Sequence, residues 1–282
     1  MIKYLSPTSL NQWEKDTEEW VFQRIVKGSK FIQTIPMAIG SRFDDLIKEH
    51  LVKEFKLDQE SATGVEVDDP VIIELGDLAF YSYLNSDSYH YLMNMLHRAS
   101  EVDLIGDFTG EIEGIPVRGK PDLAFVLENT HVLDWKTGGF QSQASPVMGY
   151  VGHKKFFYVL KQGIMCNMES PLLSRQSSWI DQLTTYNLLL KATPPFIGLI
   201  DQLTHRNSRV TCVSHREEIS LETIELTKRR YTQAWSYISQ EWYFPTVTKM
   251  ESDAMVEALF KRKGVFEGDS VNDLWYKKMM GR

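Results

Sequence analysis

Cysteine is scarce in this sequence, since only two of its 282 residues, Cys166 and Cys212, are of this type. Two cysteines allow at most one disulfide, so a disulfide framework is not expected. They also exclude a cluster held by four cysteines of one chain, so we expect no iron–sulfur cluster. With 43% hydrophobic residues, the chain can instead take its stability from a sizeable packed core.

Long apolar runs are also missing, and no internal repeat or low-complexity segment is present. No stretch reaches the length of a transmembrane helix, and the first ten residues lack the apolar centre of a signal peptide. We therefore expect no membrane partner and a cytoplasmic location, in the host cell if the protein is encoded by a phage.

An excess of positive charge is absent too, because the formal net charge is −7. This excludes a protein that coats nucleic acid through its overall charge, but a local basic patch can still contact phosphates. Lys154 and Lys155 stand among aromatic residues in the segment 153–158, a mixture typical of binding to unpaired nucleic acid. An ordinary solvated surface would give the same pattern.

Two short apolar segments predict a β-hairpin in the middle of the chain. Residues 123–127 and 131–133 are the strands, and the polar residues 128–130 supply the turn. Asp122 stands just before the first strand, whereas Asp134 and Lys136 continue the second. Since Asp134 and Lys136 are two residues apart, they point to the same face of the sheet.

The register of this hairpin decides whether the three side chains meet. A three-residue turn centred on Asn129 would place Asp122 opposite Lys136 and diagonal to Asp134, about 7–8 Å away. Both carboxylates could then reach one hard cation such as Mg²⁺, and the lysine could meet a phosphate. A two-residue turn would put Lys136 on the other face, unless a bulge restored the parity. A surface ion pair is the plainer alternative.

The segments around these residues resemble the motifs of the PD-(D/E)XK nuclease superfamily, and in particular its RecB-like branch, which includes phage recombination exonucleases. The resemblance covers residues 6–190 and rests on four elements in the expected order. They are Ser6–Trp13 as the opening helix, Gly40–Asp44 where the branch has G-x-x-x-His, the signature formed by Gly119–Asp122 with Asp134–Gly138 (DWKTG), and Gln182–Tyr186 (QLTTY) as the Q-x-x-x-Y element.

The resemblance implies a metal-dependent DNA exonuclease that hydrolyses phosphodiester bonds in phage or prokaryotic DNA recombination or repair. It implies one or two Mg²⁺ or Mn²⁺ ions as cofactor and DNA as partner. A single-strand annealing or single-strand-binding protein and a homo-oligomer are further partners found with this branch. Two alternatives stay open, a structure-specific endonuclease on flaps or junctions and a nucleic-acid-binding module without catalysis.

The resemblance also assigns roles to individual residues. Asp122, Asp134 and the main-chain carbonyl of Trp135 would hold the metal ion, and Lys136 would orient the attacking water and stabilise the transition state. Gln182 and Tyr186 would position the site or the DNA strand. Glu111 or Glu113, on the preceding predicted strand 109–116, is a candidate for one more carboxylate.

Asp44 departs from the branch, which usually carries a histidine ligand at this position. Carboxylate suits Mg²⁺ or Mn²⁺ at least as well as imidazole. The helix predicted over residues 38–55 has an apolar stripe, and Asp44 falls inside it. Because an unpaired buried carboxylate is costly, we interpret Asp44 as a metal ligand. An acid favoured by the start of a helix is the alternative.

The order of predicted elements is helices, three strands, a helix over 177–190, two strands over 196–203 and 208–215, and further helices. This order predicts a mixed α/β core of the restriction-endonuclease-like class. We expect one nuclease domain over residues 1–282, with a helical part (1–105), a catalytic α/β core (106–216) and a C-terminal helical part (217–282).

Overall fold

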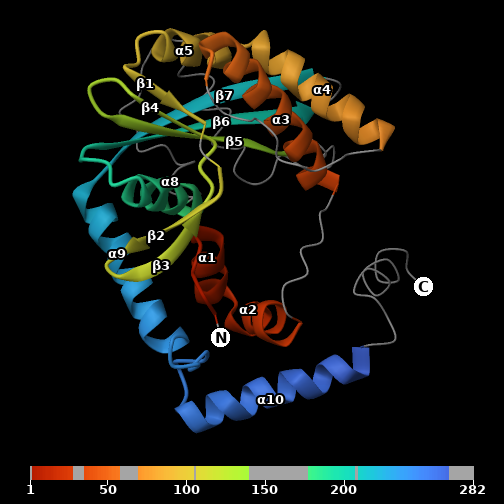
Figure 1. The fold of residues 1–282 in the computed structure, drawn as a ribbon. Helices are drawn as coiled ribbons and strands as arrows, with labels where there is room; N and C mark the ends of the chain where they lie inside the picture. The colour runs from red at the N-terminus through yellow and green to blue at the C-terminus, as the bar shows by residue number, and fades with distance from the viewer. Residues whose placement is uncertain are drawn as a thin grey trace.

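The computed structural model describes residues 2–27, 35–57, 69–104, 106–139, 177–206 and 209–266. Its centre is a five-stranded mixed sheet with the strand order β1-β4-β5-β6-β7 (Figure 1). Neighbouring strands are antiparallel, except that β5 and β6 run parallel. The strands are β1 (Glu101–Asp103), β4 (Leu123–Val126), β5 (Thr130–Gly139), β6 (Phe196–Arg206) and β7 (Arg209–Ile219).

Helices cover both faces of this sheet. Figure 1 shows α3, α4 and α5 above it, and α8 lies below it in the connection between the parallel strands β5 and β6. A parallel pair needs such a crossover, which places a helix on one face of the sheet. The upper helices are α3 (Ile35–Phe55), α4 (Pro70–Leu84) and α5 (Asp87–Leu96), and α8 is Ser177–Leu189.

Side chains of β4 and β5 alternate between two hydrophobic cores. Leu133 and Trp135 belong to the core beneath α3, α4 and α5, whereas Val132 packs in the core beside α8. Because successive residues of a strand point to opposite faces, Asp134 and Lys136 lie on the α8 face. The alternation of apolar residues thus determines which helix meets the polar side chains of β5.

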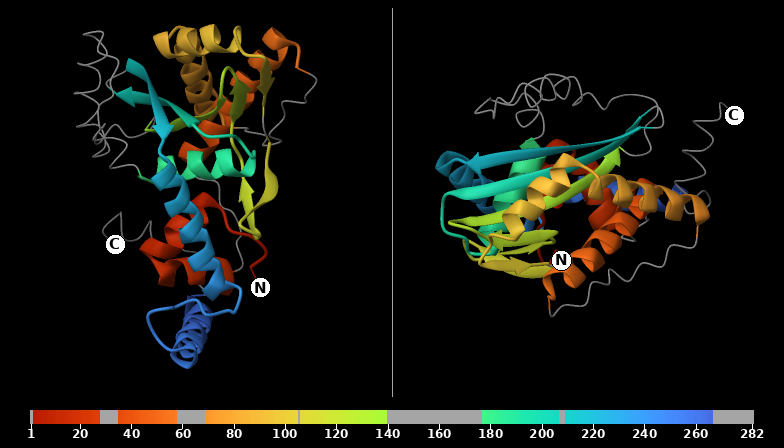
Figure 2. Two further views of the ribbon diagram at one scale, coloured as in Figure 1. Left: turned by 90° about the vertical axis from the view of Figure 1, so that its left-hand side faces the viewer. Right: turned by 90° about the horizontal axis from the view of Figure 1, so that it is seen from above.

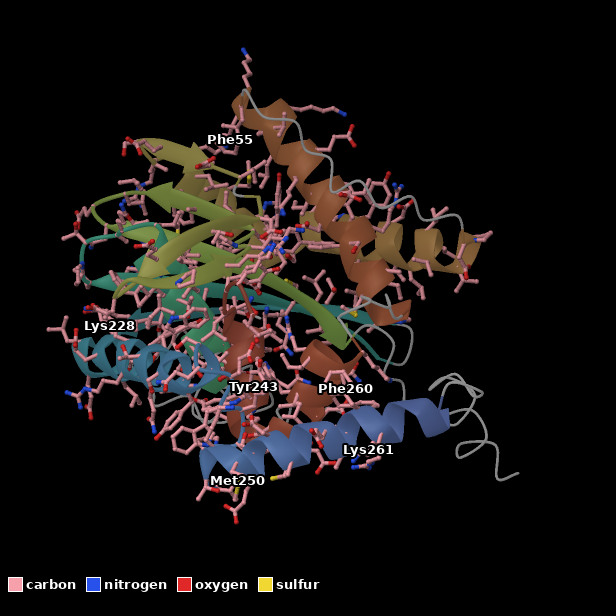
Figure 3. All side chains as sticks on the ribbon, turned by 60° about the horizontal axis from the view of Figure 1, so that its bottom comes forward. Phe55, Lys228, Tyr243, Met250, Phe260 and Lys261 are labelled. Carbon is pink, nitrogen blue, oxygen red and sulfur yellow. The ribbon has the colours of Figure 1, made fainter. Side chains whose placement is uncertain are left out.

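A third, separate core lies below the sheet, where the N- and C-terminal helices meet (Figure 2). Trp20 and Tyr231 are completely buried in it, while Met250 and Phe260 on the outer helix α10 remain 79% and 47% exposed (Figure 3). Its helices are α1 (Pro7–Lys15), α2 (Thr17–Val21), the π-helical turn η1 (Phe22–Val26), α9 (Leu221–Ile238) and α10 (Lys249–Phe266). Within the described ranges, no helix is both long and apolar enough to cross a membrane.

The single strand predicted over residues 109–116 is wrong. The chain forms a hairpin there, with β2 (Phe108–Ile112) and β3 (Ile115–Gly119) in a two-stranded sheet of their own. The turn uses Glu113 and Gly114, whose φ angles are 51° and 74°. Positive φ at both positions is typical of a two-residue hairpin turn. This hairpin packs in the third core and not beside β4.

A buried carboxylate ties the helical layer to the sheet. Asp201 of β6 is 1% exposed and accepts hydrogen bonds from the hydroxyls of Tyr83 and Ser214. Burial raises the pKa of Asp201 to about 6, and these two hydrogen bonds oppose the rise. The folded protein therefore binds a proton more tightly than the unfolded chain, in which an aspartate titrates near pH 4.

We expect the free energy of unfolding to fall as the pH rises from about 4 to about 6, because ionised Asp201 is disfavoured only in the folded state. The Asp201 contribution amounts to about 3 kcal/mol. Urea unfolding of the metal-free protein at pH 4.5 and pH 7.5 measures it. The wild type should lose more stability over this interval than Asp201→Asn does. Equal losses in the two proteins would contradict the assignment.

Candidate functional site

The hairpin of β4 and β5 brings Asp122, Asp134 and Lys136 together. Val126 pairs with Thr130 and Leu123 with Leu133, so residues 127–129 form the turn. Continued by one residue, this register places Asp122 opposite Asp134. The predicted pairing of Asp122 with Lys136 is therefore wrong by two residues, because Thr130 joins the strand and does not belong to the turn. A shift of two residues preserves the face, so the three side chains still share one side.

A main-chain hydrogen bond fixes the carboxylate of Asp122. The Trp135 N–H donates to Asp122 Oδ2 over 2.8 Å, which holds the carboxylate against β5. The Trp135 ring points the other way and packs edge-on against Phe43 and Tyr83. Trp135 thus joins the site to the core through its backbone and its ring, while the ligand role of its carbonyl stays a prediction.

Gln182 of α8 connects the other polar groups of the site. Its Oε1 accepts a hydrogen bond from Lys136 Nζ over 2.9 Å, and its Nε2 donates to Asp134 Oδ1 over 3.0 Å. The same Nε2 lies 2.6 Å from the hydroxyl of Tyr186, one helical turn further on. Lys136 Nζ also forms an ion pair with Asp134. The structure therefore brings Gln182 and Tyr186 of the QLTTY segment next to the two catalytic candidates of β5, Asp134 and Lys136.

Two glycines permit the close packing around this site. A Cβ on Gly40 would lie 2.7 Å from Thr137 Oγ1, so glycine lets α3 approach β5 beside Lys136. A Cβ on Gly119, at the end of β3, would lie 2.7 Å from Leu189 Cδ1 and would push α8 away from the β2–β3 hairpin. Such distances are far below ordinary carbon contacts.

Asp44 reaches the site from α3, together with a lysine that the sequence analysis did not identify. Lys48 Nζ lies 2.8 Å from Asp44 and 3.6 Å from Asp122 Oδ1, and its side chain is 7% exposed. Lys120 Nζ stands at the solvent side, 3.8 Å from Asp44 Oδ2. Lys48 follows Asp44 by one helical turn. At helical spacing, Asp44 lies inside the apolar stripe of α3 and Lys48 lies at the margin of that stripe.

The three aspartates form what we call the carboxylate cluster, Asp44, Asp122 and Asp134, and their crowding changes their protonation. Burial raises the pKa of Asp134 to about 7; Lys136 opposes the rise, while Asp122 and Asp44 add to it. Burial, and after it the negative charge of Asp122, raises the pKa of Asp44 to about 6, while the charges of Lys48 and Lys120 oppose the rise. Burial disfavours the charged form of Lys48, yet Asp122 and Asp44 outweigh it and raise the pKa. The cluster thus favours any added positive charge.

The donor set of the cluster fits a hard divalent cation. Asp44 Oδ1 and Asp134 Oδ2 are buried, and each faces a lysine ammonium, of Lys48 and of Lys136. Mg²⁺ and Mn²⁺ prefer such carboxylate oxygens. In the part of the chain that the structure describes, no three acidic, histidine or cysteine side chains converge as a ready set of ligands. The Lys48 ammonium lies between Asp44 and Asp122. The two carboxylates that fit one cation are therefore those of Asp122 and Asp134.

Other predicted residues lie elsewhere. Glu111 is exposed on β2, and Glu113 lies in the following turn with its carboxylate 3.6 Å from Lys228 of α9. Neither acid is among the charges that act on Asp44 or Asp134. The structure thus does not bring the proposed extra carboxylate to the site. Lys154 and Lys155 lie outside the described residues.

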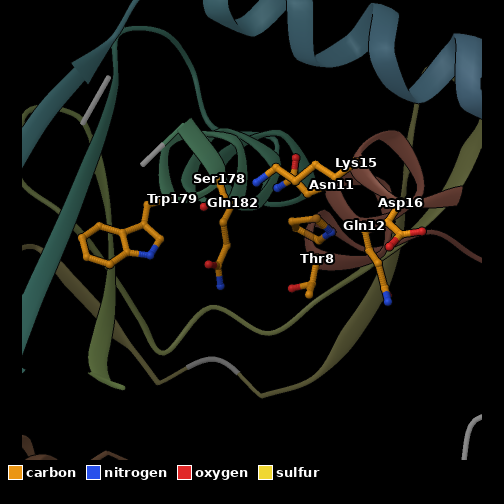
Figure 4. Close-up of a pocket in the computed structure, with 9 residues that line it drawn as sticks. Thr8, Asn11, Gln12, Lys15, Asp16, Ser178, Trp179 and Gln182 are labelled. Atoms are coloured by element: carbon orange, nitrogen blue, oxygen red, sulfur yellow. The ribbon is translucent and has the colours of Figure 1, made fainter. Parts of the chain in front are cut away.

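A cleft of about 420 Å³ opens between α1 and α8, and Gln182 is one of the residues that line it (Figure 4). Figure 4 shows the Trp179 and Gln182 side chains of α8 facing the same space as Thr8 of α1. The walls carry one aromatic ring, three amides, one cation and one carboxylate, contributed by Trp179, Asn11, Gln12, Gln182, Lys15 and Asp16. The ring and the amides suit a polar ligand with flat rings.

Comparison with known proteins gives a likeness of structure only, since no protein-family model and no curated protein matches the sequence. A crystal structure of a presumed exonuclease from Eubacterium rectale superimposes with a TM-score of 0.52 at 12% identity. The match covers 87% of this chain and 83% of the other. The two proteins share a fold. The predicted mixed α/β, restriction-endonuclease-like fold class is thereby confirmed.

A second solved structure, of a protein named SSO0001, aligns over 83% of this chain and 95% of its own at 13% identity. Its TM-score of 0.27 is too low to support an argument about fold.

Proposed function

We propose that the protein is a deoxyribonuclease that depends on Mg²⁺ or Mn²⁺ and degrades DNA from its ends, as in phage or prokaryotic recombination and repair. The observation that carries the proposal is the junction of Asp122, Asp134 and Lys136 at one end of the β4–β5 hairpin, joined by Gln182. Two carboxylates for a hard cation and one cation for a phosphate are what phosphodiester hydrolysis requires. The shared fold with a presumed exonuclease supports the same reaction class.

Asp122 and Asp134 would hold the cation, which supplies Lewis-acid chemistry at the phosphate. Lys136 donates its charge and hydrogen bonds to the phosphate oxygens as negative charge develops on them. Gln182 keeps the Lys136 ammonium in place, because its amide oxygen accepts from Nζ while its amide nitrogen is bound to Asp134. The Trp135 N–H holds Asp122 at the same end of the strand.

The substrate class can be tested with linear and closed circular DNA of the same sequence. We expect the wild type to degrade the linear form with Mg²⁺ or Mn²⁺ and to leave the circle intact. In EDTA it should degrade neither form. Cleavage of both forms would favour the structure-specific endonuclease. Binding of DNA without any cleavage would favour the inactive nucleic-acid-binding module.

The cleft between α1 and α8 offers a place for an unpaired nucleotide beside the proposed scissile phosphate. Gln182 belongs to both the cleft and the site, and Trp179 presents an indole ring for stacking. Lys15 adds a positive charge at the end of α1, where a phosphate could lie.

Trp179→Ala should weaken the affinity for single-stranded DNA about tenfold, since one base–aromatic stack contributes about 1–3 kcal/mol. Trp179→Phe should retain most of the affinity, because phenylalanine also stacks. Fluorescence anisotropy with a labelled oligonucleotide measures both, and Tyr81→Ala, which removes a 61% exposed ring on α4, is the control. Unchanged affinity in a folded Trp179→Ala protein would remove the cleft from the DNA path.

A further inference from the structure

The ammonium of Lys48 stands where two members of the carboxylate cluster face each other. Its Nζ is 2.8 Å from Asp44 and 3.6 Å from Asp122 Oδ1. Only 7% of the side chain is exposed, and the neighbouring Ile47 and Leu51 on the same helix are completely buried. A buried charge is costly to separate from its partners, so this ammonium is a fixed part of the site.

We propose that Lys48 takes the place of a second divalent cation, so that each chain binds a single Mg²⁺ or Mn²⁺ ion, at Asp122 and Asp134. The inference rests on the proposed function and defines its metal stoichiometry. Asp44 is then the anchor of Lys48 and not a direct ligand. The role of the Asp44 carboxylate is then to neutralise the buried Lys48 ammonium.

The charges around the site agree with one ion. Asp44, Asp122 and Asp134 face two buried or half-buried ammonium groups, of Lys48 and Lys136, which leaves one negative charge. The ammonium of Lys120, 3.8 Å from Asp44 Oδ2, is not counted because its side chain is 49% exposed and its charge is screened by water. One divalent cation turns this into one positive charge, which a single phosphodiester neutralises. A second divalent cation would have to enter against the Lys48 ammonium and would leave two positive charges uncompensated. Repulsion between like charges at such distances is strong in a poorly solvated site.

The geometry of the donors points the same way. The described residues hold no convergent group of three acidic or histidine ligands, although three aspartates surround one another electrostatically. Lys48 accounts for this, because its ammonium separates Asp44 from Asp122. If the ammonium were removed, Asp44 Oδ1, which is buried and lies 2.8 Å from Lys48 Nζ, would be available to a cation.

The test counts bound Mn²⁺ by isothermal titration calorimetry and by electron paramagnetic resonance of free Mn²⁺, without reference to activity. We expect one ion per chain in the wild type and in Lys48→Arg, which retains the charge. Lys48→Met should bind two ions, and the double variant Lys48→Met/Asp44→Asn should return to one. Lys53→Met is the matched control, because Lys53 pairs with Glu49 in the same i,i+4 arrangement on α3 but is 73% exposed. It should bind one ion.

Lys48→Met leaves two buried carboxylates without their cation, so its melting temperature should be low in EDTA. Saturating Mn²⁺ should raise it by more than it raises that of the wild type, since a second ion replaces the ammonium. Two ions in the wild type, or one ion in a folded Lys48→Met protein, would overturn the inference while leaving the proposed function in place. A wild type that binds no Mn²⁺ at all would overturn the proposed function itself.

Discussion

Lys136→Met is expected to lower the rate of DNA cleavage by about 10²–10³-fold, the usual cost of losing a group that stabilises developing charge. Methionine retains most of the side-chain length but removes the ammonium that Gln182 holds at 2.9 Å. Because Asp122 and Asp134 remain, Mn²⁺ should still bind. The loss should appear in kcat far more than in KM, as expected for an interaction made mainly in the transition state.

Single-turnover cleavage of a linear duplex measures this effect, with Mn²⁺ titration on the same protein sample. Lys249→Met is a suitable control, since Lys249 forms a comparable ion pair with Asp253 on the distant helix α10. Near-normal turnover by Lys136→Met would mean that the lysine only neutralises Asp134. In that case Lys48 or Lys120 would be the remaining candidate for the phosphate contact.

Local periodicity predicted the parts of the site that lie on single strands or helices. The spacing of Asp134 and Lys136 placed both on one face of β5, and the structure shows both beside Gln182. The register of the hairpin could not be predicted this way, because shifting a strand by two residues leaves every side chain on the same face. The structure shows that Thr130 is in the strand and not in the turn, which decides the register.

Contacts between elements that are far apart in the sequence could not be predicted from local sequence patterns. Lys48 lies at the margin of the apolar stripe that contains Asp44, and a lysine at such a position is usually expected to extend its ammonium into water. Only the approach of α3 to β5, permitted by Gly40, shows that the ammonium ends at Asp122. The cleft between α1 and α8 joins segments some 170 residues apart, and no local pattern indicates it.

The hairpin of β2 and β3 illustrates a signal that was present and misinterpreted. Gly114 lies within the strand predicted over residues 109–116, and a glycine at such a position favours a turn. Glu113 adopts positive φ together with Gly114, which an exposed residue tolerates in a tight turn. Glu111 therefore belongs to the two-stranded sheet of β2 and β3 and Glu113 to its turn, and both acids lie apart from the carboxylate cluster.

Asp122→Asn is expected to abolish cleavage and to weaken Mn²⁺ binding while changing the stability of the metal-free protein little. The amide oxygen of asparagine can still accept the hydrogen bond from the Trp135 N–H, so the end of the hairpin should stay in place. Lys48 also retains its closer partner, Asp44, at 2.8 Å. What is lost is the negative charge that a divalent cation needs. Since even residues that only orient metal ligands cost about 10–100-fold in affinity, the loss here should be at least as large.

Three measurements on one preparation separate a metal ligand from a structural ion pair. They are degradation of linear DNA, the Kd for Mn²⁺ by calorimetry, and the melting temperature in EDTA. Glu128→Gln is the control, because it removes an exposed acid from the turn of the same hairpin. A metal ligand predicts lost activity, a raised Kd and a nearly unchanged melting temperature. A large fall in melting temperature with an unchanged Kd would instead make Asp122 a structural partner of Lys48, and the metal would then have to be sought at Asp134 and Asp44.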